Sequence, residues 1–290
     1  MGAFAVRAAP QVLERIAADR KRAVLPAPYR PRPALWRNKG LHAAWLGHST
    51  VLLKMDGVTI LTDPVFSTRI GVGVGPVTIG LKRIVGPALD HEDLIHPDIV
   101  LLSHAHMDHF DKPSLRALES RRTTVVTAAK TSDLLRVKGY KAVYELAWRE
   151  KVRIGDITIR AVEVNHWGAR MQRDTYRGYN GYVIQSPHYR VLFAGDTAMT
   201  DAFRGLRTKR GFDLAIMPIG AYNPWVRAHC TPEQALAMAD QANAERILPV
   251  HHKTFQLSRE PYTEPIERLE AALGASGSDR LALREIGEEV

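Results

Sequence analysis

The hydrophobic positions of the chain fall mainly into short runs typical of β-strands. Continuous apolar runs bounded by polar or turn residues suit strands buried on both faces, and alternating runs suit half-buried strands. Asp56-Gly57, a favoured hairpin turn, separates two of them. Strands are therefore predicted at His42–Gly47, Thr50–Lys54, Val58–Thr62, Asp98–Leu102, Thr123–Thr127, Val143–Leu146, Lys151–Ile154, Ile157–Val164, Tyr182–Gln185, Arg190–Ala194, Asp213–Pro218 and Arg246–Val250.

Helices are predicted at Pro113–Arg121, Thr131–Lys138, Thr231–Asn243 and Glu264–Leu273. Thr231-Pro232-Glu233-Gln234 has the strongest helix start, because Thr can cap, Pro suits the first helical position and Gln completes a capping box. Residues 66–88 are rich in Gly and Val and match neither a helix nor a clean strand. They are expected to form a loop over a site, where a weakly charged loop could admit an acyl chain or pack against the body.

Residues 1–40 are expected to precede a single catalytic domain at residues 41–290. Val12, Leu13, Ile16 and Ala17 have helical spacing among basic residues, which predicts a short amphipathic basic helix. Four prolines from Pro26 to Pro33 indicate an extended connector. The helix could make peripheral contact with an anionic membrane, but packing on the domain is favoured because its apolar face is small.

The candidate chemistry centres on Ser103–Asp111, which directly follows a predicted buried strand. While the chain stays extended, His104 and His106 point to one side and can chelate a cation. After a turn, Asp108 and His109 can reach a second cation. Imidazole and carboxylate ligands suit zinc, and also iron or manganese. A polar loop with incidental histidines is disfavoured, since four ligand-type residues fall within six positions.

Three further ligand-type residues, His166, Asp196 and His251, also stand shortly after predicted strands. Loops at the carboxyl ends of neighbouring strands converge, so these residues can share one site with the His104–His109 loop. Taken singly, His166 could be a buried structural histidine, Asp196 a turn residue, and His251 or its neighbour His252 a surface residue. Together, the seven candidates are enough for two metals.

The string His104-x-His106-x-Asp108-His109 resembles the metal motif of the metallo-β-lactamase superfamily. Several strings resemble the branch that contains N-acylphosphatidylethanolamine-hydrolysing phospholipase D: Trp45-Leu-Gly-His-Ser-Thr, Leu61-Thr-Asp-Pro-Val-Phe-Ser, Ala194-Gly-Asp-Thr, Pro218-Ile-Gly-Ala-Tyr and His229-x-Thr-Pro-Glu. The resemblance spans about residues 41–265. It implies an α+β fold, a four-layer αββα sandwich, with His104, His106 and His166 on one metal, Asp108, His109 and His251 on the other, and Asp196 bridging.

The resemblance also assigns supporting roles. Asp63 would orient a ligating imidazole, although an Asp before proline can also simply form a turn. Besides Asp108, His229 is the catalytic candidate: it would face the metals and donate a proton to the leaving group, or else be a hydrogen-bonded structural histidine. His252 and Lys253 replace the Trp and Gly of the family's His-Trp-Gly-Thr-Phe segment. Cys230 lies outside the ligand pattern, which disfavours β-lactam hydrolysis.

The predicted activity is hydrolysis of a phosphodiester, small or of phospholipid type, by a hydroxide bridging two divalent cations, with zinc favoured. The 40 Lys and Arg exceed the 31 Asp and Glu, and the net charge of +9 favours such anionic substrates. Lactone or ester hydrolysis and iron-dependent redox chemistry are the alternatives.

No nucleic-acid module is recognisable, so dedicated nucleic-acid binding is not expected. No apolar stretch is long enough to span a bilayer and no signal peptide is evident, which predicts a cytoplasmic location. No oligomeric state is predicted.

Overall fold

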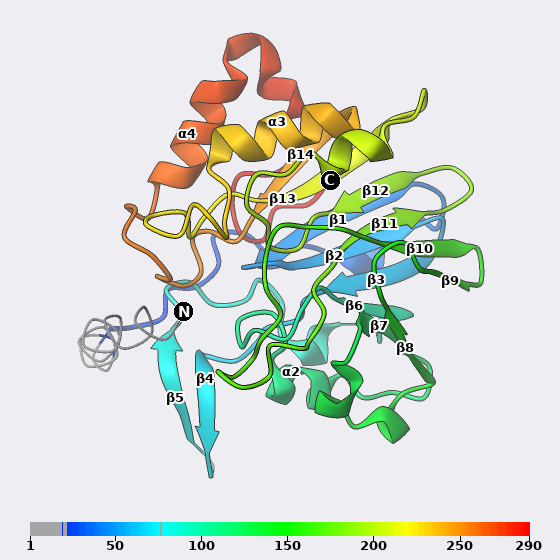
Figure 1. The fold of residues 1–290 in the computed structure, drawn as a ribbon, viewed down its shortest axis with the longest axis vertical. Helices are drawn as coiled ribbons and strands as arrows, with labels where there is room; N and C mark the ends of the chain where they lie inside the picture. Colours follow the sequence, from blue (N-terminus) through cyan, green and yellow to red (C-terminus); the bar gives the residue numbers. More distant parts are fainter. Residues whose placement is uncertain (1–18, 20–21, 76, 95) are drawn as a thin grey trace.

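The computed structural model of the protein describes residues 19, 22–75, 77–94 and 96–290, and its strands form two six-stranded sheets and one two-stranded ribbon (Figure 1). The first sheet has the order β1-β2-β3-β6-β7-β8. Its strands are β1 (Leu41–Gly47), β2 (Thr50–Met55), β3 (Val58–Thr62), β6 (Ile99–Leu102), β7 (Thr124–Ala128) and β8 (Ala142–Leu146). The second sheet has the order β14-β13-β12-β11-β10-β9. Its strands are β9 (Lys151–Ile154), β10 (Ile157–Val162), β11 (Gly181–Gln185), β12 (Arg190–Phe193), β13 (Phe212–Pro218) and β14 (Ala244–Val250).

Both sheets mix antiparallel and parallel pairing. In the first sheet β1, β2 and β3 are antiparallel, and β3, β6, β7 and β8 are parallel. In the second sheet β9 to β12 are antiparallel, and β12, β13 and β14 are parallel. Because parallel strands end at one edge, the loops after β3 and β6, and those after β12 and β14, are each brought together.

Helices cover the outer faces of the two sheets (Figure 1). α3 (Pro232–Ala242) and α4 (Glu264–Leu273) pack on the second sheet, while α2 (Lys112–Ala117) lies on the side of the first sheet. The 3-10 turns are η1 (Pro33–Leu35), η2 (His91–Asp93), η3 (Ser132–Leu134), η4 (Val137–Gly139), η5 (Ala202–Leu206) and η6 (Ala275–Arg280). The predicted four-layer αββα sandwich is confirmed.

The alternation of side chains along the strands produces separate apolar layers. On β12, Phe193 points into the core between the two sheets, where it packs with residues such as Trp45 and Ile60. The neighbouring Leu192 points the other way and packs with Met238 under α3. A third cluster on the outer face of the first sheet includes Val100, Leu102, Val125, Phe110, Leu115 and Tyr140. Burying one large aliphatic side chain contributes about 1.5–3 kcal/mol, so these layers supply the main stabilisation.

The predicted start of α3 is confirmed. Thr231 Oγ1 accepts a hydrogen bond from the backbone N–H of Gln234 (3.3 Å), and Gln234 Oε1 accepts one from the N–H of Thr231 (3.0 Å). Asn243 ends the helix in the left-handed conformation, with φ 60°. α4 ends at Gly274, also as predicted.

Two helix predictions need correction. The helix predicted at Pro113–Arg121 is shorter and begins one residue earlier, as α2. The helix predicted at Thr131–Lys138 is wrong, because the segment forms the separate turns η3 and η4. Here the Glu145 carboxylate accepts hydrogen bonds from the N–H groups of Lys130, Thr131 and Ser132 (2.9, 2.9 and 2.7 Å). These side-chain acceptors satisfy the local donors and compete with helical pairing.

The loop prediction for residues 66–88 is also wrong, because β4 (Arg69–Val74) and β5 (Val77–Lys82) form an antiparallel ribbon. Gly71 pairs with Gly80 across it. A side chain at Gly80 would meet the carbonyl oxygen of Ile70, so this close approach requires glycine. Glycines on one face of the ribbon weaken the strand signal in the sequence.

The predicted basic helix at Val12–Ala17 lies outside the described residues. The Pro-rich connector runs along the C-terminal segment, where the N–H of Tyr29 donates to Ile286 O (3.2 Å) and Trp36 Nε1 donates to Glu289 Oε2 (2.7 Å). Within the described part of the chain, no helix is long and apolar enough to cross a membrane.

Candidate metal centre

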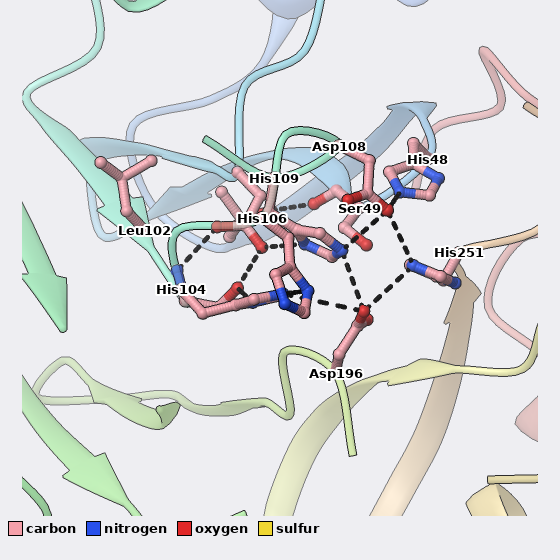
Figure 2. A network of polar contacts seen from close by, with 12 residues as sticks. His48, Ser49, Leu102, His104, His106, Asp108, His109, Asp196 and His251 are labelled. Atoms are coloured by element: carbon pink, nitrogen blue, oxygen red, sulfur yellow. Dashed lines mark hydrogen bonds and ion pairs between the residues drawn. The ribbon is translucent and has the colours of Figure 1, made fainter. Parts of the chain in front are cut away.

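Polar side chains from both sheets meet at one edge of the sandwich (Figure 2). β6 ends at Leu102 and leads into the His104–His109 loop, β12 leads to Asp196, and β14 delivers His251. His166 follows β10 after a short extended segment. The structure thereby brings together all seven residues that the sequence suggested as metal ligands: His104, His106, Asp108, His109, His166, Asp196 and His251.

One group of donors consists of three imidazoles. His106 Nδ1 lies 2.8 Å from His104 Nε2 and 3.3 Å from His166 Nε2. Asp196 Oδ2 lies 4.0 Å from His104 Nε2 and 3.8 Å from His166 Nε2. Zinc–nitrogen bonds of about 2.0–2.1 Å place tetrahedral donor atoms about 3.4 Å apart, so the separations match the donor set of one small cation.

The second group uses the other ligand-type residues. His109 Nε2 and His251 Nε2 lie 3.0 and 3.1 Å from Asp196 Oδ2, and each lies 3.5 Å from Asp108 Oδ2. Asp196 Oδ2 is therefore near both groups of imidazoles. A carboxylate in that position can bridge two cations.

Several donor atoms in the centre are buried without a hydrogen-bond partner among the described residues. They are His109 Nε2, His251 Nε2 and Asp196 Oδ1. Leaving a buried polar atom unsatisfied costs about 1–3 kcal/mol. Because these atoms converge, bound divalent cations would satisfy them, and the residues present fit a metal centre.

The ionisation of His104, His166 and Asp196 suits cation binding. At His109 and His251 the nearby Asp196 and Asp108 outweigh burial and raise the pKa, so these two imidazoles release a proton when a cation binds. Burial lowers the pKa of His104 and of His166 well below the usual range, so both imidazoles are neutral and keep a lone pair for a ligand bond. Burial by itself would raise the pKa of Asp196. The neighbouring His109 and His251 outweigh burial and hold that pKa well below its usual range, which keeps the carboxylate ionised.

Gly195 positions Asp196. Its φ is +60°, in the left-handed region, and a Cβ there would lie 2.7 Å from Asn180 O and 2.9 Å from Ser103 Cβ. The backbone of β12 therefore turns beside the β6 loop with no room for a side chain. This close approach of the two sheets carries the Asp196 carboxylate into the His104–His109 loop.

Asp63, at the end of β3, holds two of the imidazoles in place. His109 Nδ1 donates to Asp63 Oδ2 (2.7 Å), which leaves His109 Nε2 directed at Asp196. Ser103 Oγ donates to the same carboxylate oxygen (2.5 Å) and lies 2.9 Å from His104 Nδ1. The carboxylate thus orients His109 directly and His104 through Ser103, as outer partners of metal-bound histidines commonly do.

His48 is a member of the centre that the sequence analysis did not single out. Its Nε2 lies 3.1 Å from Asp108 Oδ2, and its ring centroid lies 4.3 Å from that of His251. Together with Asp108, His109 and His251 it forms one potential ligand group. His48 follows Gly47 at the end of β1 with φ 51°. The sequence signal that could have identified His48 as a ligand candidate is its position directly after a predicted strand. The other ligand candidates have the same position.

His229 lies beside the centre, in the wall of a cavity. Its Nδ1 is 3.8 Å from Asp196 Oδ2, and burial lowers its pKa to about 4. The neighbouring carbonyl of Ala228 lies 2.9 Å from His166 Nδ1 and fixes that ring. The cavity has a volume of about 250 Å³ and is lined by His106, Asp108, Trp167, Asp196, Ala221, Trp225, His229 and Leu257. A substrate in this cavity would contact His229 and both groups of donors.

The sandwich fold and the converging imidazoles and carboxylates define a metal-dependent hydrolase of the metallo-β-lactamase fold. The chain belongs to the beta-lactamase superfamily domain family, whose model matches residues 58–252. The family implies divalent metal ions as cofactors.

Similar proteins agree with this assignment. An uncharacterized protein of Mycobacterium tuberculosis is 32% identical over 90% of this chain and 72% of its own length. The N-acyl-phosphatidylethanolamine-hydrolyzing phospholipase D 1 of Caenorhabditis elegans is 32% identical over 81% of this chain and 70% of its own length. The crystal structure of isothiocyanate hydrolase from Delia radicum gut bacteria shares the fold, with a TM-score of 0.68, 19% identity, and coverage of 86% of this chain and 98% of that chain.

Proposed function

We propose that the chain is a dinuclear metal-dependent phosphodiesterase that acts on phospholipid-type substrates. The observation that carries the proposal is the position of Asp196 Oδ2, which lies 3.0 Å from His109 Nε2 and 3.8 Å from His166 Nε2, between the two groups of donors. We assign His104, His106 and His166 to one cation and Asp108, His109 and His251 to the other, with Asp196 between them. Zinc is favoured, and iron or manganese suit the same ligands.

Each residue then has a defined task. Divalent cations bound here would supply the Lewis acidity that polarises a phosphoryl oxygen and activates water. Asp63 keeps His109 in the orientation that presents Nε2. His229 is neutral near pH 7 because burial lowers its pKa to about 4, so one of its ring nitrogens carries a proton. From the cavity wall its N–H group can donate a hydrogen bond to the leaving-group oxygen and stabilise the charge that develops there.

The cavity and the charge of the chain support the choice of substrate class. Trp167, Trp225 and Leu257 add apolar side chains to the lining of the cavity, beside the polar donors. A phosphodiester with an apolar substituent matches both kinds of side chain. The net charge of +9 favours an anionic substrate, and the similarity to the C. elegans phospholipase D points to the same class. A cytoplasmic location stays a prediction from the sequence.

The test is a substrate panel on purified protein that has been stripped with a chelator and reloaded with zinc, iron or manganese. We expect turnover of an aryl phosphodiester that disappears on chelation and returns with metal. Turnover of a lactone with none of any phosphodiester would favour the alternative hydrolase. Oxygen consumption that requires iron, without hydrolysis, would favour redox chemistry.

A further inference from the structure

The β4–β5 ribbon extends away from the body of the protein (Figure 1). Its register pairs Ile70 with Leu81 and Val72 with Ile79, so these four side chains share one face. Ile70 is buried at the base, whereas Val72 and Ile79 are 46% and 53% exposed. An exposed aliphatic pair on a projecting two-stranded ribbon is unusual in a surface that meets only water.

The aliphatic face continues into the body towards the metal centre. Ile70 packs with Val65 and Phe255, and Leu81 and Leu257 pack against the same cluster. The Phe255 ring lies 5.2 Å from that of His48, and Leu257 lines the cavity at the centre. Apolar side chains therefore connect the exposed part of the ribbon with the cavity wall.

The ionisable side chains of the ribbon segment itself are all basic. Residues 64–89 contain Arg69, Lys82 and the buried Arg83 and no acidic residue. Arg69 and Lys82 pair with one another at the base of the ribbon, on the face opposite the aliphatic one. Arg22 adjoins them and donates to Lys82 O (2.8 Å), with Asp19 as its carboxylate partner. Aliphatic side chains farther along the ribbon and cations at its base match a bilayer whose headgroups are anionic.

We propose that the β4–β5 ribbon docks the protein on an anionic lipid bilayer, with Val72 and Ile79 entering the interface and Arg69 and Lys82 contacting headgroups. The inference deepens the proposed function, since it makes the bilayer the source of a phospholipid-type substrate and the apolar cluster its route to the cavity. The alternative partner for the aliphatic face of the ribbon is a second copy of the chain.

The experiment measures sedimentation of the full metal-loaded chain with vesicles of phosphatidylcholine, with and without phosphatidylglycerol. The variants are Val72→Thr and Ile79→Thr, singly and together. Threonine keeps the branched shape and the strand propensity and removes apolar surface. The matched control is Val137→Thr, because Val137 is 45% exposed but lies in η4, away from the ribbon.

We expect binding that requires phosphatidylglycerol and weakens with salt. The double variant should bind about tenfold or more weakly, while Val137→Thr binds like the wild type. Binding needs no turnover, so a failure here leaves the proposed activity standing, and the aryl phosphodiester assay tests that activity separately. Equal binding by the double variant and the wild type, or no binding by the wild type, overturns the inference. Loss of a dimer in the double variant, measured by analytical ultracentrifugation, would assign the ribbon to a second copy.

A labelled variant covers the case in which the double variant fails to fold. Cys230, the single cysteine, is buried, so Ile79→Cys offers the accessible thiol for a polarity-sensitive fluorophore. The label should shift to the blue on anionic vesicles, and the same label at Val137→Cys should not. Equal responses at the two positions contradict docking through the ribbon.

Discussion

The two sheets contribute to the metal centre in different ways. The first sheet supplies His104, His106, Asp108 and His109 from a single loop after β6. The second sheet supplies His166, Asp196 and His251 from three separate strand ends. The first contribution is local and needs only one strand end and one turn. The second exists only when β10, β12 and β14 are correctly placed, so metal binding is coupled to the packing of the whole sheet.

This difference predicts which substitutions matter most. A residue of the second sheet that is shared by both donor groups should be more sensitive than one that serves a single group. A residue that contacts substrate without binding metal should affect only turnover.

The largest effect is expected for Asp196→Ala. The variant removes the carboxylate near both donor groups and leaves His109 and His251 without its charge. Both cations should be lost together, with a loss of rate that exceeds the roughly 10- to 100-fold typical of an orienting partner. Metal analysis and aryl phosphodiester kinetics check this. Retention of full metal content would remove Asp196 from the bridging position.

Next come His251→Ala and His166→Ala, which belong to different groups of donors. Each should preferentially empty one cation position and leave about one cation per chain, with most activity lost. Equilibrium dialysis of the two variants against zinc measures the remaining sites. Complete loss of metal in both variants would show that the two positions fill only as a pair, contrary to the separate donor sets.

His229→Ala should keep the full metal content. We expect a rate lower by roughly 10²-fold, because a hydrogen-bond donor to the leaving-group oxygen is lost. The deficit should shrink for aryl substrates whose leaving group is stable as an anion. Lost metal would make His229 a ligand, and an unchanged rate on every substrate would return it to a structural role.

The smallest effect is expected on stability, from the ion pair between Glu233 of α3 and Arg268 of α4, away from the metal centre. Arg268 donates to both oxygens of Glu233 (2.8 Å each) and, as the largest cause, lowers the pKa of Glu233 to about 2 from an unperturbed value of about 4.5. The folded-state pKa is depressed, so the stabilisation is present above about pH 5 and is lost as the pH falls towards 2. Glu233 is 46% exposed, so solvent screening limits it to about 0.5–1 kcal/mol.

Denaturant unfolding of the wild type and Glu233→Gln at several pH values checks the sign. The difference in unfolding free energy should be largest near neutrality and should shrink in acid. A difference that stays constant over the whole range would mean that the carboxylate charge is not responsible.

The local contribution of the first sheet is also the part that was easiest to predict from the sequence. His104 to His109 are close in the chain, and the apolar run before them predicts β6. His166, Asp196 and His251 could be placed only through strand convergence and the family resemblance. His48 was missed because it follows Gly47 in what reads as a turn, and its contact with Asp108 is made only in the folded protein.

The errors outside the centre have similar physical causes. The ribbon at Arg69–Lys82 was missed because Gly71 and Gly80 weaken the strand pattern, although their lack of side chains is what allows the two strands to pair. The segment Thr131–Lys138 has helical periodicity, but the Glu145 carboxylate on β8 accepts hydrogen bonds from its first backbone N–H groups. In both cases a partner distant in the sequence or a close backbone approach outweighed local preference.

In the proposed centre Asp196 lies between two cations, each held by one group of imidazoles. The direct measurement is diffraction at the zinc absorption edge from crystals of the zinc-loaded protein. We expect two anomalous peaks, one beside His104, His106 and His166, the other beside Asp108, His109 and His251, with Asp196 in contact with both. A single peak at saturating zinc, or two peaks of which neither contacts Asp196, would contradict this arrangement.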